Sequence, residues 1–350
     1  MGYVPILRGL QGEFIALSET STRVQEEIRP VLEVVLEGQQ RGTVQRFFDQ
    51  ARLYLPAGVV ITLDCGTLRH LGPVGTGFGG GGLAWLSEGL DQFKQPVIPV
   101  VRPTDPPAVL IEAMQAQTLH RHGACLRVAL GDQPRGSGSG LLQHRVQAVL
   151  EAVRLAPEEV DLLLDARYVA DARAVAQALP EMLGLLSWSH RMPWRRISLA
   201  AGSFPWTVPT RATYRPQRLH RWEVSLWHQL THAAAGTLPT FADYGVTHPV
   251  HPAGPSYRGR ANLRYTTDDE WQVLVARTRE NHESFALCRT LTASEFWPPR
   301  ALPTPWGDRQ IAARATNYPT GPGGPREWRA WTTSHHLAAV SERIRAEGTP

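Results

Sequence analysis

Short apolar runs and longer helix-like segments alternate from residue 3 to residue 245 of this 350-residue chain. Eight runs have the Val, Ile and Leu content of strands that are buried on both faces. They lie at 3–7, 31–37, 58–64, 97–101, 124–130, 160–165, 195–201 and 240–245. Helical segments are expected near 14–28, 41–54, 81–93, 107–117, 140–155, 169–186 and 218–235. Strands that alternate with helices in this way form parallel sheets.

Eight such strands predict an α/β fold of the (β/α)₈ TIM-like barrel type. An open, doubly wound sheet is the alternative. Against it, the segment after the first strand, "RGLQGEF" (8–14), lacks the glycine spacing that binds a dinucleotide. The barrel is therefore the expected fold, and its active site would lie where the strands end.

The pattern changes after residue 245. The segments 260–267 and 270–278 alternate in polarity and predict a β-hairpin with one wet face. A helix near 282–294 follows, and then a loop rich in proline and glycine. The segment 335–347 predicts an amphipathic helix, the eighth of the barrel, with Ser334 as its N-cap. We expect one barrel domain over 1–350, with 246–330 as an insertion that contains the hairpin and the long loop.

Composition limits the cellular setting. The hydrophobic fraction is 42%, which suffices for a large core, and no apolar run reaches the roughly 18–20 residues of a membrane span. The N-terminus has no signal-peptide pattern. The three cysteines, Cys65, Cys125 and Cys288, lie far apart, which argues against a disulfide framework and a structural zinc site. We expect a cytoplasmic protein without a membrane partner.

Polar residues stand at most of the predicted strand ends, where a barrel places its catalytic groups. The candidates for acid/base catalysis or for binding a divalent metal such as Mg²⁺ or Mn²⁺ are Glu33, Asp64, Asp165, Asp243 and Tyr244. Asp243, at the end of the eighth strand, is expected to face the barrel mouth. The alternative is that Asp–Arg pairs only cap the barrel and satisfy loop backbones.

Arginine supplies nearly all of the positive charge, because Lys94 is the only lysine and the net charge is +4. GC-rich coding bias would explain this equally well, but guanidinium groups also suit phosphate and carboxylate. The candidates for substrate binding are Arg8, Arg102, Arg167, Ser203, Arg264 and Tyr265. His335 or His336 is the candidate proton donor to a leaving group.

Two further segments carry weaker signals. The glycine-rich "GPVGTGFGGGG" (72–82) lacks the Lys-Ser/Thr of a P-loop, so we interpret it as a mobile loop rather than a phosphate cradle. The segment "WPPRALPTPW" (297–306) could stack on bases, although such residues more often pin a long loop to the body.

Four segments together resemble the family named for the phage beta protein, often labelled "beta family protein". They are "YVPILRGLQGEFIAL" (3–17), "FADYGVTHP" (241–249), "ANLRYTTDDEWQVLVART" (261–278) and "GPREWRAWTTSHHLAAV" (324–340). Other members typically carry lysine where this chain has Arg8. The resemblance implies a single full-length, barrel-like domain in a setting of phage–host conflict, such as antiviral defence. The residues in the matching segments include Glu13, His248 and Trp328 besides the candidates above.

Two functions follow as hypotheses. The first is a hydrolase, similar to a phosphodiesterase, that acts on a nucleotide or nucleic acid at the barrel mouth. The second is a non-catalytic recognition module that binds a phage component, a nucleic acid or a partner subunit through the hairpin and long loop. Under the first, alanine at Asp243 abolishes activity without unfolding the protein; under the second, deletion of 300–325 has the larger effect.

Overall fold

The first eight predicted strands close into a parallel barrel, as expected. The computed structural model describes residues 2–35, 40–68, 81–131, 139–208, 215–234, 238–250, 260–297, 304–316 and 321–350. The barrel strands are β1 (Tyr3–Leu7), β2 (Val31–Glu33), β3 (Ile61–Asp64), β4 (Val97–Val101), β5 (Ala124–Ala129), β6 (Val160–Tyr168), β7 (Arg196–Gly202) and β9 (Thr240–Asp243). The register of β1 and β9 pairs Tyr3 with Phe241 and Pro5 with Asp243, which closes the barrel.

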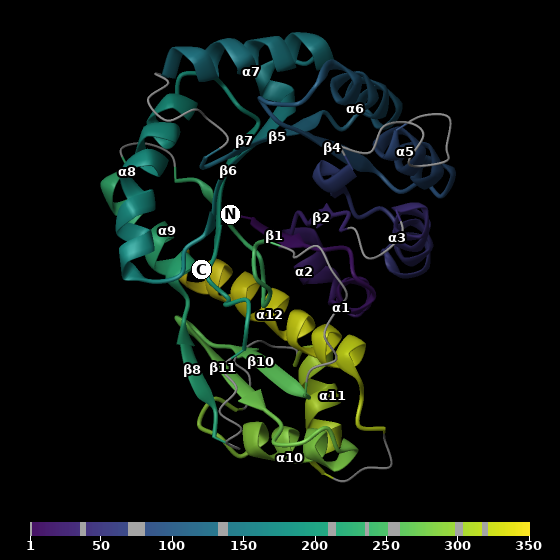
Figure 1. Cartoon of the computed structure of the whole chain (residues 1–350), viewed down its shortest axis with the longest axis vertical. Helices are drawn as coiled ribbons and strands as arrows, with labels where there is room; N and C mark the ends of the chain where they lie inside the picture. Colours follow the sequence, from purple (N-terminus) through teal and green to yellow (C-terminus); the bar gives the residue numbers. More distant parts are fainter. Residues whose placement is uncertain are drawn as a thin grey trace.

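Helices follow the strands and cover the outside of the barrel (Figure 1). They are α1 (Gln11–Ser18), α2 (Thr22–Glu27), α3 (Gln40–Tyr54), α5 (Gly82–Gln92), α6 (Pro107–His120), α7 (Ser139–Val153), α8 (Ala172–Ser189) and α9 (Trp222–Ala233), with short 3₁₀ turns at Gly66–Leu68 and Pro157–Glu159. The single helix expected over 14–28 is two helices, because Ser21 caps the start of α2 with its side chain. Most of the glycine-rich segment 72–82 lies outside the described residues.

A three-stranded antiparallel sheet lies beside the barrel. Its order is β10 (Asn262–Thr266), β11 (Glu270–Val275) and β8 (Gln217–His220). The expected hairpin is therefore present as β10 and β11. The start of the helix expected over 218–235 is instead strand β8, because these residues pair with β11. This sheet is consequently built from segments on both sides of β9, and not only from the predicted 246–330 insertion.

Two further helices pack with this sheet, α10 (Asn281–Thr292) and α11 (Trp306–Ala315). The predicted long loop thus contains α11. A Cβ at Gly307 would lie 2.0 Å from the Trp331 carbonyl oxygen, so α11 depends on glycine here to approach the last helix. Together, β8, β10, β11, α10 and α11 form a small lobe below the barrel in the view of Figure 1.

The last helix, α12 (Pro325–Glu347), runs between the barrel and the small lobe (Figure 1). It begins ten residues before the expected start at 335, with Gly324 and not Ser334 as its N-cap. Ser334 lies mid-helix, where its hydroxyl accepts a hydrogen bond from the Gly307 amide at 3.2 Å. The middle of α12 is buried from Ala330 to Ala338. The first turns of α12 were not predicted, because proline and glycine residues at its start are typical of a loop.

Side chains alternate between the two faces of each barrel strand. Val4, Ile6, Ile98, Leu163 and Ala242 belong to a small apolar cluster inside the barrel. The opposite faces join a larger core under the surrounding helices. The alternation decides which strand-end polar groups enter the barrel and which point away from it.

Candidate functional site

Arg127, from β5, is the centre of the polar groups inside the barrel. Its Nη1 donates to Glu33 Oε1 at 2.7 Å and to Asp64 Oδ2 at 2.6 Å. Its Nε and Nη2 donate to Asp165 Oδ2 at 3.0 Å and 2.8 Å. One guanidinium therefore binds three carboxylates from β2, β3 and β6, a geometry for which its planar fork of donors is suited.

Two more predicted site residues complete this inner cluster. The Tyr244 hydroxyl donates to Asp165 Oδ2 at 2.6 Å and accepts from Arg127 Nη2. Arg102 donates to Asp64 Oδ2 from Nη2. Tyr244 lies inside because it is two residues after the inward-facing Ala242.

The electrostatics of the inner cluster differ between its carboxylates. Burial opposes ionisation of Asp64, but Arg102 and Arg127 hold its pKa below the usual range. Burial, against the effect of Arg127, raises the pKa of Glu33. The Glu33 side chain is also the most exposed of the three carboxylates bound to Arg127, at 18%. Glu33 is thus the member best suited to exchange a proton with a ligand.

Asp243 points out of the barrel, and not into the mouth as the sequence predicted. It stands one residue before the inward-facing Tyr244, so the pleat turns it to the opposite face. Its carboxylate accepts from Tyr3 Oη at 2.5 Å, from the Gly245 amide at 3.0 Å, and from Arg221 Nη2 at 3.3 Å. His336 Nε2 lies 3.0 Å from its Oδ2. Its environment is a junction between the barrel wall and helix α12.

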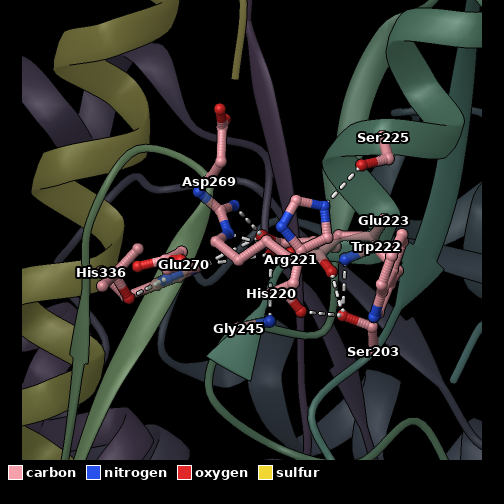
Figure 2. A network of polar contacts seen from close by, with 12 residues as sticks. Ser203, His220, Arg221, Trp222, Glu223, Ser225, Gly245, Asp269, Glu270 and His336 are labelled. Carbon is pink, nitrogen blue, oxygen red and sulfur yellow. Dashed lines mark hydrogen bonds and ion pairs between the residues drawn. The ribbon is translucent and has the colours of Figure 1, made fainter. Parts of the chain in front are cut away.

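Arg221 continues this outer network toward α9 (Figure 2). Its Nε donates to Glu223 Oε1 at 2.9 Å, and its Nη1 donates to the Asp268 carbonyl at 2.9 Å. Ser203, expected to bind substrate, donates its hydroxyl to Glu223 Oε2 at 2.6 Å and accepts from the Trp222 amide. These side chains are buried, which places Ser203 in a structural network rather than on a ligand-facing surface.

The two candidate histidines have their ring nitrogens occupied. His335 faces Asp308 Oδ2 at 3.0 Å and the Thr266 carbonyl at 2.8 Å. Both partners are acceptors, so the ring must donate from both nitrogens as an imidazolium. Asp308, against the effect of burial, accordingly raises the pKa of His335. The Tyr265 ring stacks on it with centroids 3.7 Å apart.

His336 is the neutral counterpart of His335. Its Nδ1 lies 2.8 Å from the Thr266 hydroxyl, while Nε2 faces Asp243 and Tyr3. Burial lowers the pKa of His336. A neutral ring that donates from Nε2 and accepts at Nδ1 satisfies every partner. Neither ring contacts a residue of the inner cluster. The catalytic role predicted for these two histidines stays a prediction.

A cleft of about 750 Å³ lies between the C-terminal end of the barrel and the small lobe. Its walls come from the segments after β7 and β9, from β10 and β11, and from the first turns of α12. The charged and aromatic residues that line it are Arg260, Arg264, Arg277, Arg279, Arg329, Trp206 and Trp328. We call it the arginine cleft, because within the described residues no carboxylate lines it.

Arg264 is a cation in the arginine cleft whose environment opposes its charge. Its guanidinium donates to two neutral acceptors, the Val246 carbonyl at 2.6 Å and Asn262 Oδ1 at 3.1 Å. Burial, together with the charges of Arg329 and Arg8, lowers the pKa of Arg264 to about 9. Buried Glu13 interacts with Arg8 and Arg329, whereas the hydrogen bonds of Arg264 go to neutral groups. An anion beside Arg264 would therefore be stabilised.

The family model described as Beta protein matches residues 3–342, nearly the whole chain. The chain belongs to the Beta protein family. This confirms the resemblance found in the sequence. A search of curated proteins returned no match to this Beta protein. Among the described residues, no helix of this Beta protein is long and apolar enough to cross a membrane.

Two predicted site residues remain, Arg8 and Arg167. Arg8 holds the loop after β9 by donating to the carbonyls of His248 and, at 3.1 Å, Val250. Arg167 is an exposed residue with a positive φ of 58°, whose amide donates to Asp165 Oδ1 at 2.8 Å.

The sequence pattern did not indicate Arg127, Arg221 or Arg329 as site residues. Arg127 interrupts an otherwise apolar strand, "ACLRVA", and that single buried charge was the signal that could have revealed it. In the described parts of the chain, no group of three or more His, Cys, Asp or Glu side chains could hold a metal ion. Glu33, Asp64 and Asp165 converge on Arg127 instead.

Proposed function

We propose that this Beta protein binds a phosphate-containing ligand, a nucleotide or a nucleic acid, in the arginine cleft. The observation that carries the proposal is the environment of Arg264. Its half-buried guanidinium lies beside two other arginines, and within the described residues its hydrogen bonds go to neutral acceptors. A phosphate group would supply the missing negative charge and bidentate acceptors.

The charge around this site supports the same conclusion. Burial lowers the pKa of Arg8, and the charge of Arg329 acts in the same direction, while Glu13 and Glu33 oppose both effects. The arginine cleft is therefore electrostatically continuous with the barrel mouth. A ligand phosphate in the cleft would relieve the repulsion without the loss of any existing ion pair of Arg264.

The test is ligand binding by the full chain, measured by calorimetry with pyrophosphate, ATP and a short oligonucleotide. We expect Arg264→Met and Arg329→Met each to weaken binding at least about tenfold, the scale of one charge-assisted contact. Arg191→Met, an exposed arginine after α8, is the matched control and should bind as the wild type does. Wild-type affinity in Arg264→Met would refute the proposal.

A hydrolase is the second candidate function, and Glu33 favours it. The carboxyl of Glu33 combines a raised pKa, partial exposure and a position beside Arg127. A general base near neutral pH needs these properties. Under the hydrolase hypothesis, the arginine cleft holds the phosphate, and Glu33 activates a water molecule at the barrel mouth. Asp64 and Asp165 would then hold the Arg127 guanidinium beside Glu33.

Turnover separates the hydrolase from the recognition module. Phosphate release from nucleotides and oligonucleotides is measured for the wild type and for Glu33→Gln, with Mg²⁺ or Mn²⁺ present and absent. Turnover that is lost in Glu33→Gln while binding remains would support the hydrolase. Tight binding without turnover in the wild type would support a recognition module.

Two broader expectations belong to this proposal. Cys65, Cys125 and Cys288 are unpaired thiols, which supports a reducing, cytoplasmic location. A role in phage–host conflict is what the family resemblance implies, and phosphate recognition is compatible with it. Comparison of phage plating on cells with the wild type and with Arg264→Met tests that role directly.

A further inference from the structure

A row of aromatic rings leads away from the arginine cleft along the barrel mouth. Trp206, which lines the cleft, is 50% exposed. Its ring packs edge-on against His248 with centroids 5.2 Å apart, and the His248 ring lies 4.2 Å from that of Tyr168. We call Trp206, His248 and Tyr168 the aromatic row. A large, exposed indole beside a cationic cleft is a surface on which a base can stack.

Arg8 fixes the position of the aromatic row relative to the cleft. Its guanidinium donates to the carbonyls of His248 and Val250, so it holds the backbone that carries His248. Arg264 binds the same segment, because its Nη1 donates to the Val246 carbonyl at 2.6 Å. The cation cluster and the stacking surface are therefore parts of one site, joined by the segment after β9.

We propose that the ligand of the arginine cleft is a single-stranded nucleic acid, with backbone phosphates on Arg264 and Arg329 and an unstacked base on Trp206. This inference rests on the phosphate binding proposed above. Single strands are recognised by this combination of a positive groove and an aromatic platform. A duplex keeps its bases stacked inside and cannot present a face to Trp206.

The cleft and the aromatic row together are longer than one nucleotide. A volume of about 750 Å³ lies within the range of about 300–1,000 Å³ that holds a drug-sized ligand, and the aromatic row extends beyond it. Further arginines, among them Arg260 and Arg277, line the same cleft. A mononucleotide would fill the cleft and leave Tyr168 and His248 without a contact, whereas an oligonucleotide would reach both.

The experiment measures binding of labelled single strands of two, four and eight nucleotides, as DNA and as RNA, by fluorescence anisotropy. An eight-residue duplex and ATP are the comparison ligands. We expect affinity to rise at least tenfold from ATP to the eight-residue strand, and the duplex to bind at least tenfold more weakly than the strand. Trp206→Ala should weaken strand binding at least fivefold, while Trp206→Phe should restore most of it.

The salt dependence gives a second readout that does not depend on turnover. For a single strand, the slope of log affinity against log salt is about −0.7 for each phosphate contacted. Arg264→Met should lower its magnitude by about that amount, and Trp206→Ala should leave it unchanged. The control Arg191→Met should change neither affinity nor slope.

The outcomes separate the two proposals. If ATP and pyrophosphate bind as tightly as the eight-residue strand and Trp206→Ala has no effect, phosphate binding stands and the single-strand inference is refuted. If the duplex binds as tightly as the strand, the inference is refuted in the same way. If no phosphate-containing ligand binds at all, both proposals are refuted.

Discussion

His336 Nε2 lies 3.0 Å from Asp243 Oδ2, and this contact joins helix α12 to the last barrel strand. Tyr3, from the first strand, donates to the same carboxylate at 2.5 Å. The register also places Asp243 beside Pro5 where β1 and β9 close the barrel. One buried carboxylate therefore holds three distant segments together at the closing seam. Its best-supported role is to stabilise the fold.

Asp243→Asn should destabilise the protein by about 3 kcal/mol, because it removes one of the two buried carboxylates that pair with Arg221 and leaves Glu223 as the other. Urea unfolding at pH 7 measures the change. Asp49→Asn, at an exposed position on α3, should stay within about 0.5 kcal/mol of the wild type. An Asp243→Asn variant of wild-type stability that loses only activity would support a catalytic role for Asp243 instead.

The same carboxylate should make the wild type sensitive to strong acid. Burial opposes its ionisation, but His336, Arg221 and Tyr3 lower the pKa of Asp243 from 3.8 to about 2. A carboxyl whose pKa is lowered by folding contributes stability above its unfolded pKa, and that stability is lost as the pH falls through the folded pKa. We expect a loss between about pH 4 and pH 2 that is smaller in Asp243→Asn. Equal losses in both proteins would contradict this assignment.

His335 should produce the opposite dependence at higher pH. Its pKa is raised above 6.5 by Asp308, so its contribution is fully present below pH 6.5 and is lost as the pH rises through the folded pKa. The free energy of unfolding of the wild type should fall as the pH rises from 6.5 through the folded pKa of His335, and that of His335→Gln should not. The exposed His282→Gln is the control. A parallel pH profile for His335→Gln and the wild type would show that His335 is not a buried imidazolium.

Arg127→Met should destabilise the barrel by about 3–5 kcal/mol at pH 8, because Glu33 and Asp165 lose their cation inside the barrel. The deficit should shrink toward pH 5, since carboxyls without a partner can take up protons instead. Urea titrations at several pH values measure both effects. A deficit that does not change with pH would mean that the carboxylates stay ionised without Arg127.

Arg264→Met should have little effect on stability, within about 1 kcal/mol, in contrast to Arg127→Met. The loss of two hydrogen bonds is offset by the relief of repulsion from Arg8 and Arg329. Inorganic phosphate should raise the melting temperature of the wild type more than that of Arg264→Met. An equal rise in both proteins would show that phosphate acts only through general salt effects.

The barrel could be predicted because its signal is local and repeated. Runs such as "VDLLLD" and "RRISLAA" are apolar over their whole length, as parallel strands buried on both faces must be. Strand β8 could not be predicted in the same way. Its four residues, "QRLH", have no strand pattern of their own and become a strand only because β11 pairs with them.

The candidate site shows the same division. Glu33, Asp64, Arg102, Asp165 and Tyr244 were found because they stand at or near strand ends, and they do meet inside the barrel. Asp243 was assigned to the wrong face, because a shift of one residue reverses the direction of a strand side chain. The arginine cleft could not be predicted, because its walls come from the segments after β7 and β9 and from β10, β11 and α12, and no local pattern links them.

The pairing of β8 with β11 has a consequence for synthesis on the ribosome. When β8 emerges, its partner strand has not yet been translated, and the β1–β9 seam still lacks the His336 contact from α12. The barrel strand β9 lies in the chain between β8 and β10, so it is translated before the small lobe can be completed. Folding of the two parts should therefore be coupled late in translation. A nascent chain stalled before residue 325 should stay sensitive to protease over the barrel as well as over the small lobe.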